Sequence, residues 1–178
     1  MILEPTGLRG VTLLRGVRHH DDRGALRKIL VLDEARAHGI DVRVHEVVST
    51  TNTEAGTVRG LHYQVAPFEE TKTLWVTEGA LYDVLVDVRP DEPTYGHWVG
   101  VELSADDDLA LHVPAGIAHG YQTLADDTSL TYLIGAAYSP DHARTLRWDD
   151  PEVGVAWPRP VTRISDKDRD GQPWPPAR

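Results

Sequence analysis

The chain contains no cysteine, and this absence removes several kinds of site from consideration. Disulfides, thiolate metal ligands and a cysteine nucleophile are all excluded. Long apolar runs are also lacking, because none approaches the roughly 18 residues that a membrane-spanning helix requires. The first residues have no basic segment leading into an apolar stretch, so we predict no secretory signal and a cytoplasmic location.

Positive charge is in short supply. The chain has 18 lysines and arginines against 28 aspartates and glutamates, which gives a formal net charge of -10. Nucleic acids and anionic membranes bind basic surfaces, so we expect neither of them as a partner. If the ligand is an anion, the cations that bind it must be concentrated at one place.

Apolar and polar residues alternate with a period of two over most of the chain, which is the pattern of β-strands. In residues 81–88, Tyr82 and the three valines are predicted to face the core, and the opposite face is predicted to be partly covered. The sequence predicts further strands at residues 42–48, 74–77, 99–103, 109–113 and 129–134. One helix is predicted at residues 33–38, capped by Asp33 and ended by Gly39.

The spacing of these strands predicts the fold class. The 15 glycines and 12 prolines are spread along the chain, as expected for many short strands joined by turns. Such a pattern is typical of an all-β sandwich or barrel of the jelly-roll type, with few short helices. The length favours a single domain over residues 1–178, and we expect the tail after Trp157 to wrap around its surface.

One short segment carries most of the chemistry. Residues 59–64 read Arg-Gly-Leu-His-Tyr-Gln, Lys72 follows, and His119 comes after a Pro-Ala-Gly turn. Arginine and lysine make charge-assisted hydrogen bonds to phosphate. A histidine can transfer protons near neutral pH. The segment therefore predicts binding of an anionic small molecule and proton transfer on it.

These motifs have the order and spacing of a known family. The chain resembles the cupin-type sugar-nucleotide epimerases of the dTDP-4-dehydrorhamnose 3,5-epimerase family over nearly its whole length. The resemblance implies a cupin-like jelly roll, a homodimer, and a nucleotide-sugar substrate, with a dTDP-linked sugar favoured. The matching segments are residues 22–24, 58–64, 72, 83–89, 93–96, 103–104, 114–120, 132, 138–140, 148–151, 157–158 and 165–168.

The chemistry of such a reaction defines the groups that it needs. A 4-keto sugar nucleotide has acidic protons at C3 and C5, and inversion requires a base, an acid on the opposite face and a group that holds the enolate oxygen. No metal and no redox cofactor are required. The resemblance implies that His62 is the base, that Asp168 fixes its tautomer, and that Tyr132 is the acid. It also implies that Lys72 stabilises the enolate.

The resemblance also implies a set of substrate-binding residues. His119 matches a residue that contacts the substrate, and Tyr138 matches one that stacks on the base. At two other matched positions the chain departs from the family, because Lys28 replaces a glutamate and Ser49 replaces an asparagine. The positions that match contacts to the nucleotide diphosphate are Arg23, Arg59 and Lys167.

Structural interpretations of the same residues remain open. His62 and Tyr132 also fit strand residues that pack in a core, and Asp168 also fits a solvated loop. Asp83 and Asp87 are interpreted as structural hydrogen-bonding groups, whereas His45 is a candidate pocket residue. The remaining histidines are predicted to lie on the surface: His19, His20, His38, His97, His112 and His142.

Three other functions are compatible with parts of the pattern. A nucleotide-sugar 3,4-ketoisomerase would move the carbonyl instead of inverting a carbon. A metal-dependent cupin needs a His-x-His pair and a glutamate, but the chain has Gln64 at the second histidine position, and Lys72 would repel a cation. A non-catalytic sugar-binding module would bind without proton exchange. Whether one or two carbons are inverted, and which nucleotide base is bound, is left open by the sequence.

Overall fold

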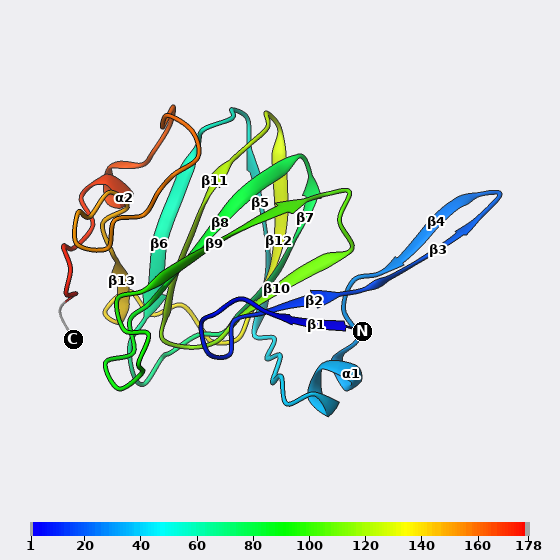
Figure 1. Cartoon of the computed structure of the whole chain (residues 1–178), viewed down its shortest axis with the longest axis horizontal. Coiled ribbons are helices and arrows are strands. Elements are labelled where there is room, and N and C mark those ends of the chain that lie inside the picture. Colours follow the sequence, from blue (N-terminus) through cyan, green and yellow to red (C-terminus); the bar gives the residue numbers. More distant parts are fainter. Residues whose placement is uncertain (1, 177–178) are drawn as a thin grey trace.

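The computed structural model describes residues 2–176, so positions 1, 177 and 178 of the predicted domain lie outside the described residues. Two antiparallel sheets pack face to face, and a separate two-stranded hairpin projects from one side (Figure 1). The predicted all-β jelly-roll class is confirmed. In the described part of the chain, no helix is long and apolar enough to cross a membrane.

The two sheets and the hairpin account for all the named strands. The first sheet has the order β1 (Ile2–Pro5), β2 (Thr12–Arg15), β10 (Leu109–Val113), β7 (Lys72–Glu78), β12 (Thr128–Ile134) and β5 (Glu46–Asn52). The second sheet has the order β13 (Ala143–Thr145), β6 (Val58–Gln64), β11 (Ile117–Thr123), β8 (Ala80–Asp87) and β9 (Trp98–Ser104). The hairpin consists of β3 (Val17–Asp21) and β4 (Gly24–Lys28), and the helices are α1 (Leu32–Ala37) and α2 (Asp166–Arg169).

Both faces of β8 are buried, and the predicted core face is the wrong one, because the valines lie on the outer side of the second sheet and the leucines face the first sheet. Leu81 and Leu85 belong to the main cluster between the sheets, whereas Val84 and Val86 belong to a second cluster. The second cluster lies on the outer side of the second sheet, where Trp157 and other tail residues cover it. The tail therefore wraps the sandwich as predicted, and it gives β8 a buried environment on both sides.

Local structure near the N-terminus differs most from the expectations. The strand predicted at residues 42–48 begins only at Glu46, because Val42 packs into a third cluster with Ala35 of α1. The helix forms where it was predicted, but its N-cap is Val31 and no side chain caps it. Seven strands were not among those predicted: β1 to β4, β6, β11 and β13.

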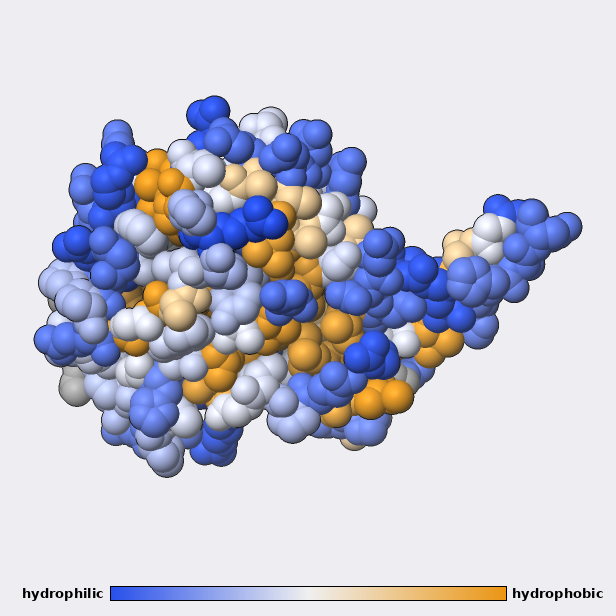
Figure 2. Space-filling view, turned by 45° about the horizontal axis from the view of Figure 1, so that its top comes forward, coloured by the Kyte–Doolittle hydropathy of each residue, from blue (hydrophilic) through white to orange (hydrophobic). Residues whose placement is uncertain are grey.

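The β3–β4 hairpin stands apart from the sandwich. It extends to the right of the body in Figure 1, and Figure 2 shows its surface as mostly hydrophilic. Residues 19–26 are all exposed, and Leu26 keeps 59% of its area accessible. In the same view, apolar side chains gather on the body beside the base of the hairpin. An isolated two-stranded hairpin has little stability of its own, so its base must be held in place.

Candidate active site

Two glycines bring the strands of the site together. Gly60 on β6 has φ +119°, and a Cβ added to it would lie 2.4 Å from the Cα of Gly120 on β11. The antiparallel register pairs His62 with His119, and a β-bulge follows between His119 and Tyr121. The motif thus needs glycine at both positions, because the backbones of β6 and β11 approach too closely for a side chain.

His62 faces the interior of the sandwich. Its neighbours Leu61 and Tyr63 belong to the cluster on the outer side of the second sheet, so the residue between them points the other way. Its Nε2 lies 2.6 Å from Oδ1 of Asp168, and 39% of the His62 side chain remains exposed. The histidine ring is therefore fixed through Nε2, and the rest of the ring remains accessible to a ligand.

Asp168 owes its position to the short helix α2. Ser165 is the N-cap, and its hydroxyl accepts a hydrogen bond from the Asp168 N–H. Burial alone would raise the pKa of the Asp168 carboxyl, but hydrogen bonds from His62, the Gly60 N–H and Ser165 lower it below its usual value. A carboxylate at this position requires the proton of neutral His62 on Nε2, which leaves the Nδ1 lone pair to act as a base.

Lys72 lies against the backbone of the same histidine. Its Nζ donates a hydrogen bond to the His62 carbonyl oxygen at 3.1 Å, and the residue is almost fully buried. The Glu70 carboxylate lies 3.0 Å from the same ammonium group, and its side chain is also largely buried. Sequence reasoning missed Glu70, although its separation of two residues from Lys72 was a usable signal. The carboxylate offsets the cost of burying the lysine charge.

A second histidine–aspartate pair lies across the strand from the first. His119 Nε2 and Asp83 Oδ1 are 2.7 Å apart, and both side chains are almost completely buried. Among the described residues, neither carboxylate oxygen of Asp83 nor His119 Nε2 has a hydrogen-bond partner, so the pair is a close contact without a hydrogen bond. Burial raises the pKa of the Asp83 carboxyl, while the nearby His119 opposes this shift. Asp83 was interpreted as a hydrogen-bonding group, and its place beside His119 was missed.

Tyr132 on β12 completes this wall of the site. Its ring packs edge-on against His119, with 6.0 Å between ring centroids and an interplanar angle of 77°. Burial, followed by the neighbouring Tyr121 and Asp83, raises the pKa of the Tyr132 phenol well above its ordinary value. The phenol therefore keeps its proton at neutral pH, as an acid must before it donates.

Arg59 is positioned by a polar network at one end of the site. Its Nε donates to Asn52 Oδ1 at 2.8 Å, and Asn52 in turn bonds the hydroxyl of Tyr121. Arg59 also lines a cavity of about 590 Å³ between β6 and the tail, together with Arg163 and Asp168. A cationic group at the wall of such a cavity suits a phosphorylated ligand.

Tyr138 lies in the loop after β12, with 60% of its area exposed. The buried side chain of Gln64, the last residue of the Arg-Gly-Leu-His-Tyr-Gln motif, binds the backbone on both sides of it. Gln64 donates to the Ala137 carbonyl and accepts from the Ser139 N–H, at 3.1 and 2.7 Å. The motif therefore sets the position of the loop that carries Tyr138.

Three of the predicted substrate-binding residues lie away from this set. Arg23 is in the turn of the hairpin and pairs with Asp21. In Figure 1 the hairpin projects from the side of the molecule away from β6 and α2. Lys28 is at the end of the same hairpin. Ser49 pairs with Thr131 on the outer side of the first sheet, since Val48 is the residue that packs inward. Lys167 is exposed on α2 beside Asp168.

The predicted surface position of His112 is wrong. His112 was expected on the surface, but it is buried on β10 and its Nδ1 lies 2.9 Å from the Thr73 hydroxyl. Burial lowers the pKa of His112 to about 4. The candidate pocket residue His45 is exposed before β5. Within residues 2–176, no group of three or more His, Asp or Glu side chains is arranged to hold a metal ion.

Comparisons with known proteins agree with this geometry. The sequence model of the dTDP-4-dehydrorhamnose 3,5-epimerase family matches residues 5–175. A protein of that name from Sinorhizobium fredii is 40% identical over 173 residues, which cover 97% of this chain and 89% of the relative.

Solved structures show the same fold. The Mycobacterium tuberculosis rmlC epimerase superposes with a TM-score of 0.91 at 31% identity, covering 97% of this chain and 88% of the other. ChmJ, a 3'-monoepimerase from Streptomyces bikiniensis in complex with dTDP-quinovose, gives a TM-score of 0.87 at 31% identity, with 95% and 86% covered. The match of family, sequence and fold extends over nearly the entire chain, which therefore belongs to the dTDP-4-dehydrorhamnose 3,5-epimerase family.

Proposed function

We propose that this enzyme epimerises a dTDP-linked 4-keto-6-deoxy-hexose at C3, at C5 or at both carbons. The observation that carries the proposal is the 2.6 Å contact between His62 and Asp168, in a wall that also contains Lys72, His119 and Tyr132. The names of the relatives support this substrate class. A solved relative from Legionella pneumophila, 27% identical, is described in complex with dTDP-4-keto-L-rhamnose.

The first step is proton abstraction. Nδ1 of His62 takes the proton from the carbon beside the ketone, and the electrons of that C–H bond move to form the enolate oxyanion. The Asp168 carboxylate on Nε2 stabilises the imidazolium that results. The Lys72 ammonium lies next to the His62 backbone and is the cation best placed to hold the oxyanion.

The second step returns a proton on the opposite face. The Tyr132 phenol donates to the enolate carbon, the carbonyl reforms, and the carbon is inverted. The phenolate then recovers a proton from solvent while His62 loses its own, so the enzyme returns to its starting state. The raised pKa of Tyr132 makes the phenolate short-lived, which favours this recovery.

Other residues bind the nucleotide part. Arg59 lies at the wall of the cavity beside Asp168, where a diphosphate would find a cation. Lys167 is exposed on the adjacent helix and can approach the same group. Tyr138, held in place through Gln64, offers an exposed ring for stacking on the base. His119, held beside Asp83, contacts the sugar.

We also propose that the protein works as a homodimer. Arg23 and Lys28 match substrate-binding positions, yet both lie on the projecting hairpin. A hairpin that extends away from its own site can reach a substrate in a second copy of the chain. Apolar side chains near its base, seen in Figure 2, give such a copy a surface to cover.

The test is proton NMR of a dTDP-4-keto-6-deoxy-glucose in D₂O with purified enzyme. Loss of the C3 and C5 signals supports inversion at two centres, and loss of one supports a single centre. A carbonyl shifted to C3 identifies a ketoisomerase, and no exchange with any 4-keto substrate contradicts the proposal. His62→Ala should abolish exchange while dTDP still binds, because the base is lost and the nucleotide contacts remain.

A further inference from the structure

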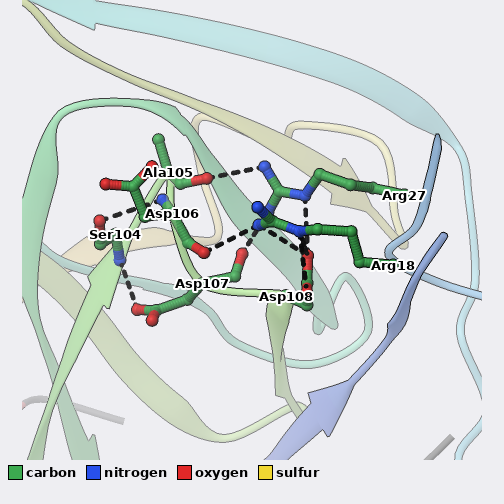
Figure 3. A network of polar contacts seen from close by, with 7 residues as sticks. All are labelled: Arg18, Arg27, Ser104, Ala105, Asp106, Asp107 and Asp108. Atoms are coloured by element: carbon green, nitrogen blue, oxygen red, sulfur yellow. Dashed lines mark hydrogen bonds and ion pairs between the residues drawn. The ribbon is translucent and has the colours of Figure 1, made fainter. Parts of the chain in front are cut away.

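A cluster of arginine and aspartate side chains at the base of the hairpin is the feature of interest. Arg18 on β3 and Arg27 on β4 pair directly across the hairpin. Both guanidinium groups reach the turn between β9 and β10, where they meet the carboxylate of Asp108 (Figure 3). The Arg18 Nε lies 3.0 Å and the Arg27 Nε 2.9 Å from the same Oδ1.

The same two side chains also bind the backbone of that turn. Arg18 donates to the carbonyl of Asp106 at 2.8 Å, and Arg27 donates to the carbonyls of Ala105 and Asp107. All three charged side chains keep only 24 to 27% of their area exposed. A planar guanidinium with several fixed donors holds its acceptors in one orientation, which a lysine does not.

Two hydrogen bonds within the turn hold its conformation. The N–H of Ser104 donates to Asp107 Oδ2, and the N–H of Asp106 donates to the Ser104 hydroxyl. These bonds aim the carbonyls of the turn at the arginines, as Figure 3 shows. The turn thus presents a prepared set of acceptors, and the hairpin supplies the donors.

A backbone hydrogen bond also ties the base of the hairpin to the turn between β9 and β10. The Gly16 N–H donates to the Asp108 carbonyl at 2.7 Å, and a Cβ on Gly16 would lie 2.2 Å from the Lys28 carbonyl. The chain entering the hairpin and the chain leaving it are therefore packed together beside Asp108. Beyond this point residues 19–26 are exposed, so the direction of the hairpin is set at its base.

We propose that Arg18, Arg27 and Asp108 form a positioning clamp, which holds the hairpin of one chain in the direction needed to present Arg23 and Lys28 to the substrate site of a second copy. This inference rests on the proposed function, because it assigns the clamp to the shared site. The three residues are positioning residues, since they act on the substrate through Arg23 and Lys28.

The experiment compares Asp108→Asn and the double variant R18Q/R27Q with wild type. Asp108→Asn keeps the backbone acceptor for Gly16 and removes the shared charge. Arg147→Gln is the matched control, because it breaks an exposed arginine–aspartate pair far from the hairpin. Asp108→Glu restores a carboxylate and serves as the conservative rescue. Melting temperature and sedimentation identify any variant that fails to fold or to dimerise.

Two readouts decide the outcome. Amide hydrogen exchange of residues 17–28 should accelerate at least about tenfold in the clamp variants and not in the control. The KM for the dTDP-sugar should rise about tenfold with kcat changed less than about twofold, because the hairpin residues bind substrate but do not react. Asp108→Glu should recover part of the loss in KM.

Contrary results are distinguishable. Unchanged exchange overturns the clamp, and faster exchange with an unchanged KM overturns its link to the site. If R18Q/R27Q does not fold, the Asp108→Asn and Asp108→Glu pair gives the same decision. A wild-type enzyme that turns over no 4-keto sugar contradicts the proposed function instead, and exchange then still reports whether the clamp orders the hairpin.

Discussion

At the residue scale, two histidine–aspartate pairs face each other across β6 and β11 but have opposite electrostatic environments. Hydrogen bonds from His62, the Gly60 N–H and Ser165 outweigh burial and lower the pKa of Asp168, so this carboxyl is charged. Burial dominates for Asp83 and raises its pKa. A charged partner suits a histidine that must become an imidazolium, whereas a desolvated partner suits one that only holds a position.

Replacing Tyr132 with phenylalanine separates the two proton transfers. The variant should lose about 100-fold or more in formation of inverted product, a typical contribution of a general acid. Deuterium should still enter the substrate, because His62 and Asp168 remain intact. The measurement is product analysis alongside NMR exchange in D₂O. Full turnover by Tyr132→Phe would show that another group is the acid.

His112 makes stability depend on pH. Its pKa is about 4 in the folded protein, against an ordinary value near 6.5, so the unfolded chain binds the proton more readily. The contribution of the neutral His112 ring to the free energy of unfolding is complete above about pH 6.5. It is lost as the pH falls towards 4, and the free energy of unfolding decreases by about 3 kcal/mol over this range.

We therefore expect His112→Asn to flatten the pH dependence of stability between pH 6.5 and 4. Urea unfolding at several pH values in that range measures the free energy of unfolding for both proteins. His38→Asn is the matched control, because His38 is exposed after α1. Equal slopes for wild type and His112→Asn would contradict the assignment.

At the element scale, the close approach of β6 and β11 places His62, the proposed base, opposite His119. Gly60 and Gly120 permit this approach, and the bulge after His119 sets the register. At the other end of β6, the Gln64 side chain makes two hydrogen bonds to the backbone of the loop that carries Tyr138. One strand thus fixes both the proposed base and the loop proposed to bind the nucleotide base.

Gly60→Ala should destabilise the protein by on the order of 3 kcal/mol, because the new Cβ meets the β11 backbone and the residue has a positive φ. Gly39→Ala is the control, since Gly39 also has a positive φ but open space around it. Urea unfolding of both variants separates backbone strain from the clash. Similar losses in the two would mean that the close approach costs little.

At the scale of the whole molecule, the proposed homodimer predicts complementation. A chain with His62→Ala keeps Arg23 on its hairpin, and a chain with Arg23→Ala keeps His62, the proposed general base. In a mixed dimer, one site combines an intact His62 with an intact Arg23 from the partner, so about half of the wild-type activity should return. At substrate concentrations well below KM, His62→Ala alone should be inactive, and Arg23→Ala alone should lose at least about tenfold in kcat/KM because Arg23 binds substrate but does not react.

The measurement is steady-state activity of co-expressed, differently tagged chains purified through both tags. No recovery in the mixed dimer would show that Arg23 acts within its own chain or not at all. Sedimentation of the wild type establishes the oligomeric state independently. A monomer in solution at assay concentration would contradict the shared site.

Part of the site follows from residue types and their spacing. The order of Arg59, His62, Lys72, Tyr132 and Asp168 indicates the family, and period-two alternation predicts an all-β sandwich. Both signals are read from residue types and their order along the chain, so they need no knowledge of contacts between segments. The strands β1 to β4 escaped prediction because their alternation is short and interrupted by charge.

The amino-acid sequence by itself therefore determined the fold class, the family motifs and the residue types of the proposed active site. Only the tertiary structure decided that Asp83 lies beside His119, that Glu70 neutralises Lys72, and that the hairpin carrying Arg23 points away from its own site. The physical reason is that such pairings depend on strand register, burial and the direction of a hairpin. These arise from contacts between segments far apart in the chain, which local patterns do not encode.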